Sequence, residues 1–176
     1  METVDMNATQ IRLYDVIIAL LRSPGFTTSV KDSAFRYGFL NYVAKYSLAK
    51  EYYWVSPAAK EVIEERGFIK KAGLRRGLKS RKNGFTYEHP IPSNVIADAA
   101  IQSRGDAEKV KSILKWSDIV VILTSEEDAK LSGKLRTKMP EDWVFFMSDK
   151  YARYRAVGLD MVDRLETVPM LGSISR

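Results

Sequence analysis

The sequence predicts an α+β fold in which a mostly helical domain surrounds a small β-hairpin core. Two observations predict it. Apolar residues recur at helical spacing through the first third of the chain. Alternating and β-branched runs appear only later, after the Asn83-Gly84 dipeptide, which is a strong signal for a two-residue hairpin turn.

The N-terminal region, residues 1–66, is predicted to be helical. One helix covers 10–22 and is followed by a Ser-Pro-Gly turn. A second helix covers 31–54. Its apolar stripe contains Phe35, Phe39 and Val43. The aromatic residues of this second helix have two interpretations, packing in a core or stacking on nucleic-acid bases, and both stay open.

Further helices are predicted on either side of the first strand. Ser56 and Pro57 match the N-cap and the first position of a helix that ends near Gly67. Two more helices are expected over 94–102 and 106–115, each preceded by a polar residue that can cap it. These helices frame the predicted β-structure.

The predicted core lies in a second region, residues 67–135. Its first strand covers 85–89, and the two prolines that follow end it because proline cannot donate to a strand ladder. The apolar, β-branched run DIVVIL at 118–123 is the second strand. This strand leads directly into a helix that Thr124 or Ser125 can cap, with acidic residues in its first turn.

The third region, residues 136–176, is predicted to hold one helix and a tail. The helix covers the basic and aromatic run DKYARYRAVGL at 149–159, in which Gly158 is the expected stop. A polar tail follows from about residue 167. We expect the three regions to form one compact domain.

The amino-acid composition limits the classes of protein to which this chain can belong. The chain has 176 residues, of which 45% are hydrophobic, and it has no cysteine. It can therefore bury a core without disulfides, and thiol nucleophiles and thiolate zinc sites are excluded. The apolar run near the N-terminus is shorter than the roughly 20 residues of a membrane span, and no secretion signal precedes it. We expect a cytoplasmic protein without a membrane partner.

Positive charge is concentrated in one segment. Eight cations and no acid lie between residues 66 and 82, although the formal net charge of the chain is only +6. Such a segment is typical of phosphate binding, and the alternative is a solvated basic loop. We expect nucleic acid as partner, with DNA favoured over RNA. The candidate nucleic-acid-binding residues are Lys70, Lys71, Arg75, Arg76, Lys79, Arg81 and Lys82.

One stretch combines the residues that could carry chemistry. The sequence lacks the G-x-S-x-G, Walker, G-x-G-x-x-G and H-E-x-x-H motifs, but FTYEHPIP at 85–92 contains the only histidine, His89, directly after Glu88. The second strand and the acidic helix SEEDAKL follow in order. This arrangement resembles the HNH (ββα-metal) endonucleases over residues 83–135, and the resemblance implies a ββα-metal-like core.

The resemblance also implies roles for four residues. His89 would be the general base, Glu88 and Asp128 the metal ligands, and Asp118 the residue that orients the base. The helix has carboxylates where the family has a second histidine. Mg²⁺ or Mn²⁺, which prefer oxygen ligands, are therefore the expected ions.

Two functions follow as expectations. The first is a metal-dependent nucleic-acid phosphodiesterase that uses a single histidine as general base. The second is a non-catalytic module that binds nucleic acid or protein on a degenerate nuclease frame. The acids of the helix also have a structural interpretation, because any helix N-terminus is stabilised by negative charge. Glu88 and His89 could likewise be an ordinary surface pair.

Overall fold

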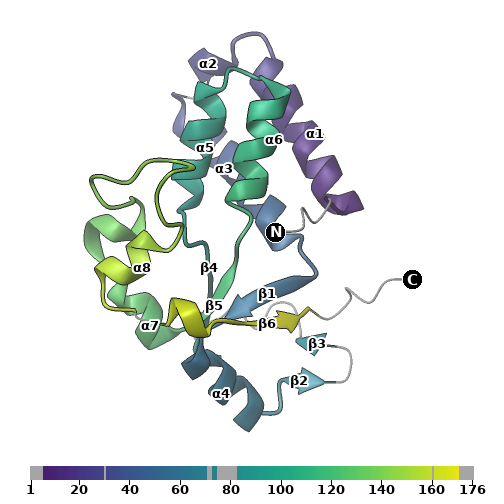
Figure 1. Ribbon diagram of the computed structural model, residues 1–176. Helices are drawn as coiled ribbons and strands as arrows, with labels where there is room; N and C mark the ends of the chain where they lie inside the picture. Colours follow the sequence, from purple (N-terminus) through teal and green to yellow (C-terminus); the bar gives the residue numbers. More distant parts are fainter. Residues whose placement is uncertain (1–5, 30, 71–72, 75–82, 160, 171–176) are drawn as a thin grey trace. The chain divides into compact units, whose positions relative to one another are not determined.

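The structure is a computed structural model that describes residues 6–29, 31–70, 73–74, 83–159 and 161–170 (Figure 1). It has the expected α+β fold. Contacts between Cα atoms divide the chain into two compact units: unit 1 is Met1–Lys50 with Ser93–Asp118, and unit 2 is Glu51–Pro92 with Ile119–Arg176. The units therefore interleave in the sequence, whereas the three expected regions were consecutive.

Unit 1 is helical over its described residues. Its helices are α1 (Ala8–Arg22), α2 (Phe26–Ser29), α3 (Ser33–Leu48), α5 (Ser93–Gln102) and α6 (Ala107–Trp116). Side chains of Asn7, Asp32 and Asp106 cap α1, α3 and α6 by accepting hydrogen bonds from the first-turn amides. α3 packs against α1 and α5, and α5 against α6 (Figure 1). Ile17 and Phe39 lie fully buried between these helices.

Unit 2 is built on a mixed sheet with the strand order β4-β5-β1-β6. The strands are β1 (Tyr52–Val55), β4 (Phe85–Glu88), β5 (Val121–Thr124) and β6 (Glu166–Pro169). β1 and β5 run parallel, and the other two pairs are antiparallel. Every residue of β5 except Thr124 is completely buried, as expected for a strand with neighbours on both sides.

Short helices and a separate antiparallel pair of two-residue strands complete unit 2 (Figure 1). They are α4 (Pro57–Glu65), β2 (Ile69–Lys70), β3 (Gly73–Leu74), α7 (Ser125–Lys130), the 3₁₀ turn η1 (Gly133–Arg136), α8 (Ala152–Ala156) and the 3₁₀ turn η2 (Val162–Arg164). Val121 and Leu123 of β5 share one core cluster with Leu131 and Tyr154. This cluster holds α7 and α8 against the sheet. None of the helices among the described residues is long and apolar enough to cross a membrane.

Two predictions of local structure are wrong. The helix expected over 31–54 ends at Leu48, and Tyr52–Val55 is the strand β1. Its aromatic and β-branched residues pair with β5 on one side and β6 on the other, and this tertiary pairing outweighs the helical spacing of the preceding run. The tail expected from 167 begins with β6, which gains its order from the same ladder.

The strand predicted over 85–89 is confirmed as β4, which ends one residue earlier, at Glu88, but its observed partner differs from a hairpin neighbour. Gly84 has a φ of +77°, which fits a turn that begins the strand. The residue range 75–82, which would supply a hairpin neighbour, lies outside the described residues. β4 instead pairs with β5, more than thirty residues further on. The helices between these two strands, α5 and α6, belong to unit 1.

Candidate functional site

The three elements that suggested a nuclease frame lie together in unit 2. β4 and β5 are antiparallel, with Phe85 opposite Thr124 and Glu88 opposite Val121. The amide of Ser125 donates to the Gly84 carbonyl across 2.8 Å, so α7 starts beside the beginning of β4. α7 contacts both strands. The two strands and the helix, which follow one another in the sequence, therefore also lie next to one another in space. Their candidate residues are Glu88, His89 and Asp128.

Glu88 lies at the end of β4 and forms an ion pair with Arg153 of α8. The Nη2 atom of Arg153 donates to the Oε1 atom of Glu88. The Arg153 side chain is completely buried, and the Glu88 side chain is 21% exposed. A buried guanidinium is stable only with a charge partner and with its donors satisfied, and Glu88 is that partner.

The other donors of Arg153 bind backbone carbonyls. Nε donates to the Pro90 carbonyl across 3.1 Å, and Nη2 also donates to the His89 carbonyl. Nη1 donates to the carbonyls of Leu135 and Arg136, at 2.8 and 3.1 Å. A guanidinium has five N–H donors, so the four contacts with carbonyls and the one contact with Glu88 together use all of them. Arg153 thus fixes the His89 segment to the chain that follows α7.

The pKa of Glu88 is raised above the usual range for a glutamate. Burial is the main cause, because it disfavours the charged carboxylate. Arg153 acts in the opposite direction, and the negative charge of Asp128 adds to the rise. The two carboxylates are therefore close enough to interact electrostatically, and the proton affinity of Glu88 reflects both burial and this like charge.

Asp128, the second expected metal ligand, also has a cationic partner. Its Oδ2 atom lies 3.1 Å from Nη2 of Arg136. The neighbouring Glu127 completes a capping box with Thr124 and accepts a hydrogen bond of 2.6 Å from the Ser56 hydroxyl. The acids of α7 therefore serve local contacts, as the structural interpretation of a helix N-terminus predicts.

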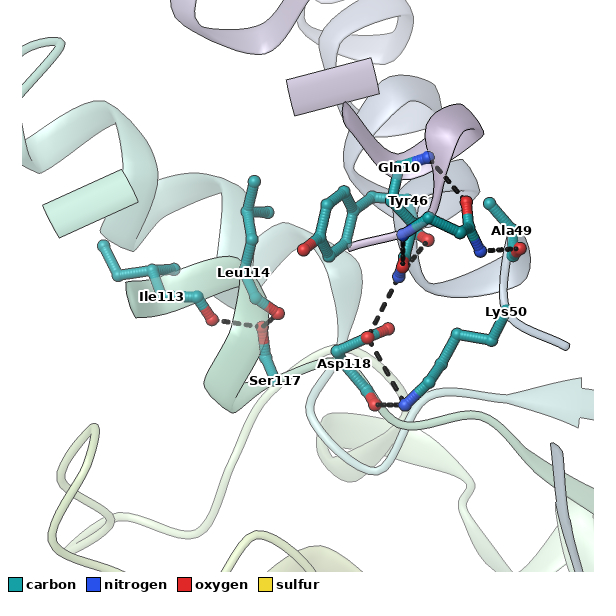
Figure 2. Close-up of polar contacts among 9 residues, drawn as sticks. Gln10, Tyr46, Ala49, Lys50, Ile113, Leu114, Ser117 and Asp118 are labelled. Atoms are coloured by element: carbon teal, nitrogen blue, oxygen red, sulfur yellow. Dashed lines mark hydrogen bonds and ion pairs between the residues drawn. The ribbon is translucent and has the colours of Figure 1, made fainter. Parts of the chain in front are cut away.

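Asp118 lies in unit 1, at the end of the chain segment that follows α6. Figure 2 shows its contacts: Gln10 Nε2 donates to Asp118 Oδ2 across 3.0 Å, and Lys50 Nζ lies 3.3 Å from the same oxygen. Lys50 also donates to the Asp118 carbonyl across 2.8 Å. Asp118 is thus assigned to unit 1, whereas His89 is assigned to unit 2.

Tyr46 joins the same polar cluster of unit 1 (Figure 2). Its carbonyl accepts a hydrogen bond of 3.4 Å from Gln10 Nε2. Burial, with a further contribution from the charge of Asp118, raises the pKa of the Tyr46 hydroxyl. The cluster connects α1, α3 and the end of α6, so its role is to stabilise the packing of unit 1.

The described residues do not fit a preassembled metal site. Glu88 and Asp128 each bind an arginine, and a cation beside each carboxylate already balances its charge. Nowhere in the described ranges do three or more His, Asp or Glu side chains gather as metal ligands would. The Nε2 atom of His89 is buried.

The basic segment lies mostly outside the described residues. Lys70 is in β2, whereas Lys71, Arg75, Arg76, Lys79, Arg81 and Lys82 fall in the ranges that the structure does not describe. The two ends of the segment are placed, however. Arg66 Nη1 donates to the Asn83 carbonyl across 3.1 Å, and the rings of Phe68 and Phe85 meet edge to face with their centroids 6.2 Å apart. The described residues at the two ends of the segment therefore contact each other within unit 2.

Arg153 is the central residue that the sequence did not single out. It stands in a helix beside Arg155, and cations in a short basic helix are normally solvated. In the structure Arg155 is 45% exposed and Arg153 is fully buried. The apolar residues around Arg153 in the sequence, among them Tyr154 and Val157, are the one available signal for a buried face.

Comparison of the chain with protein-family models, curated proteins and solved structures finds no match. The HNH resemblance consequently rests on the residues and on the order of β4, β5 and α7.

Proposed function

We propose that this protein is a nucleic-acid-binding module that uses its basic segment, residues 66–82, to bind phosphates, with DNA favoured over RNA. The observation that supports it is the concentration of positive charge in that segment. The ends of the segment are held together within unit 2 by the contact of Arg66 with Asn83 and of Phe68 with Phe85. Eight cations without an acid form a strong local attraction for a polyanion.

The carboxylates of the nuclease-like frame support a non-catalytic role. Glu88 is committed to Arg153, whose five donors bind Glu88 and four carbonyls around it. This arrangement is what a structural anchor requires. In the proposal the β4-β5-α7 frame presents the basic segment, and Arg153 stabilises that frame.

Metal-dependent phosphodiester cleavage is the second candidate. The specific observation in its favour is that β4, β5 and α7 bring Glu88, His89 and Asp128 into one unit, where the charge of Asp128 influences the pKa of Glu88. For cleavage, an ion would have to bind beside an arginine at each carboxylate or displace it. The arrangement therefore favours binding over cleavage.

One experiment separates the two candidates. Purified protein is incubated with labelled duplex DNA, single-stranded DNA and RNA, in EDTA and with Mg²⁺ or Mn²⁺, and both binding and cleavage are followed. The proposal predicts binding that does not require the ions and no cleavage that His89→Ala abolishes. Ion-dependent cleavage that is lost in His89→Ala would establish the phosphodiesterase instead.

A further inference from the structure

A group of exposed apolar side chains lies on the surface of unit 2. The chain between η1 and α8 contains neither helix nor strand over residues 137–151 (Figure 1), and Trp143–Met147 lies within it. Val144, Phe146 and Met147 are 51%, 50% and 85% exposed. Three of the exposed large apolar side chains among the described residues thus fall within four positions. We call Trp143–Met147 the aromatic tip.

The aromatic tip is held in one conformation by its own contacts. The Trp143 indole donates to the Asp149 carbonyl across 2.9 Å. The Val144 amide donates to the Ser148 hydroxyl, and the Ser148 amide donates back to the Val144 carbonyl, each across 2.9 Å. Asp149 in turn forms an ion pair of 2.8 Å with Arg155 of α8. These hydrogen bonds and this ion pair therefore fix the conformation of the loop that carries the exposed side chains.

The rings of the aromatic tip form a chain of edge-to-face contacts. The centroids of Trp143 and Phe145 are 5.4 Å apart, and those of Phe145 and Phe146 are 4.9 Å apart. Phe146 has a φ of +68°, a backbone conformation that is unfavourable for a bulky residue. Its neighbours thus hold Phe146 in a strained conformation in which half of the side chain stays exposed.

We infer that the aromatic tip is a stacking site for an unpaired base of single-stranded nucleic acid. This inference rests on the proposed nucleic-acid binding and adds the class of ligand. An exposed, pre-ordered aromatic ring offers a base a stacking partner with little loss of conformational freedom. Bases in a duplex are already stacked, so the site selects single strands.

Size and charge favour a base over a protein surface as the occupant. A stable protein interface buries on the order of 800 Å² on each partner, far more than three neighbouring side chains provide. Exposed Glu141 and Asp142 border the aromatic tip on one side. These acids disfavour a phosphate next to the rings, so the tip should contact the base alone and add nothing to the salt dependence of binding.

The test measures how removal of the Phe146 ring changes the affinity for nucleic acid and the dependence of that affinity on salt. Binding of a fluorescein-labelled single-stranded oligonucleotide and of its duplex is measured by fluorescence anisotropy at several salt concentrations. Phe146→Ala removes the ring. Phe146→Gly removes it and also relieves the positive φ, so this variant stays folded even if the alanine variant does not. Ile11→Ala, which shortens an exposed apolar side chain of unit 1, is the control.

The inference predicts that both Phe146 variants bind the single strand about 5- to 150-fold more weakly. Their slope of affinity against salt and their affinity for the duplex stay at the wild-type values, and Ile11→Ala binds like the wild type. Wild-type affinity of Phe146→Gly for the single strand would overturn the inference and leave the proposed function standing. A wild-type protein that binds neither ligand would overturn both.

Discussion

The side chain of Arg153 binds the carboxylate of Glu88 inside unit 2 and leaves none of its N–H groups without an acceptor. This relationship assigns Glu88 a partner that the sequence did not suggest. It also explains how the loop from His89 to Pro90 keeps a fixed position beyond the end of β4. The stability of unit 2 should therefore depend on this pair, and the first two predictions test it.

Arg153→Met should destabilise the protein by about 3–5 kcal/mol, because it leaves Glu88 and several backbone carbonyls without their cation. The free energy of unfolding is measured by chemical denaturation. Arg155→Met is the matched control, since Arg155 is half exposed and its ion pair with Asp149 should contribute about 1 kcal/mol or less. Equal stabilities of the two variants would show that the buried contacts of Arg153 are not important.

Glu88→Gln should change how stability depends on pH. Because burial raises the pKa of Glu88, the folded protein binds this proton more tightly than the unfolded chain does. The stabilisation is fully present below the unfolded pKa and is lost as the pH rises through the folded pKa. The wild type should therefore gain stability relative to Glu88→Gln as the pH falls from about 7 to 4.

Urea unfolding of both proteins across that pH range provides the measurement. Glu141→Gln, a change at an exposed acid, controls for the loss of one carboxylate. If the wild type instead loses stability relative to Glu88→Gln toward acid pH, the attraction of Arg153 outweighs burial and the pKa of Glu88 is lowered.

Val121→Asp should prevent stable folding of unit 2. Val121 is completely buried in β5, and an unpaired carboxylate there would have no partner in the core. The same substitution at the exposed Val144 should leave the melting temperature close to that of the wild type. A Val121→Asp protein that melts like the wild type would show that β5 is misplaced.

Asp118→Ala should lower stability by about 1–3 kcal/mol, because Gln10 and Lys50 lose their acceptor. Thermal unfolding is the measurement, and Asp163→Ala, at an exposed side chain, is the control. A residue that only orients a catalytic base would leave stability unchanged. Unaltered unfolding of Asp118→Ala would therefore argue against the structural role of the cluster in Figure 2.

Local signals in the sequence predicted much of the fold. The helix after Ser56 and the helix after Thr124 start where predicted, because their caps are formed by nearby residues. The strand within DIVVIL was found because its apolar run is buried on both faces. Tyr52–Val55 was assigned to the wrong element, since its strand conformation depends on partners that are distant in the sequence.

The candidate site was only partly predictable for the same reason. The order of Glu88-His89, second strand and acidic helix indicated that these parts meet, and the antiparallel pairing of β4 with β5 brings them into one unit. The burial of Arg153 is signalled only by the apolar residues beside it, and the placement of Asp118 in unit 1 has no local sequence signal. Both depend on how chain segments pack after folding.

The proposed binding through the basic segment is tested most directly by the dependence of nucleic-acid affinity on salt. Affinity for labelled DNA is measured between about 50 and 200 mM salt for the wild type and for a variant with Arg75, Arg76, Lys79 and Arg81 all changed to Gln. The matched control changes four cations of unit 1, Lys45, Lys109, Lys111 and Lys115, to Gln.

Each lost phosphate contact should reduce the slope of log affinity against log salt by about 0.9 on duplex DNA, so the variant of the basic segment should be flatter by up to about 3.6 and bind more weakly. The unit 1 control should keep a slope close to that of the wild type. A basic-segment variant with the wild-type slope and affinity would contradict the proposed function.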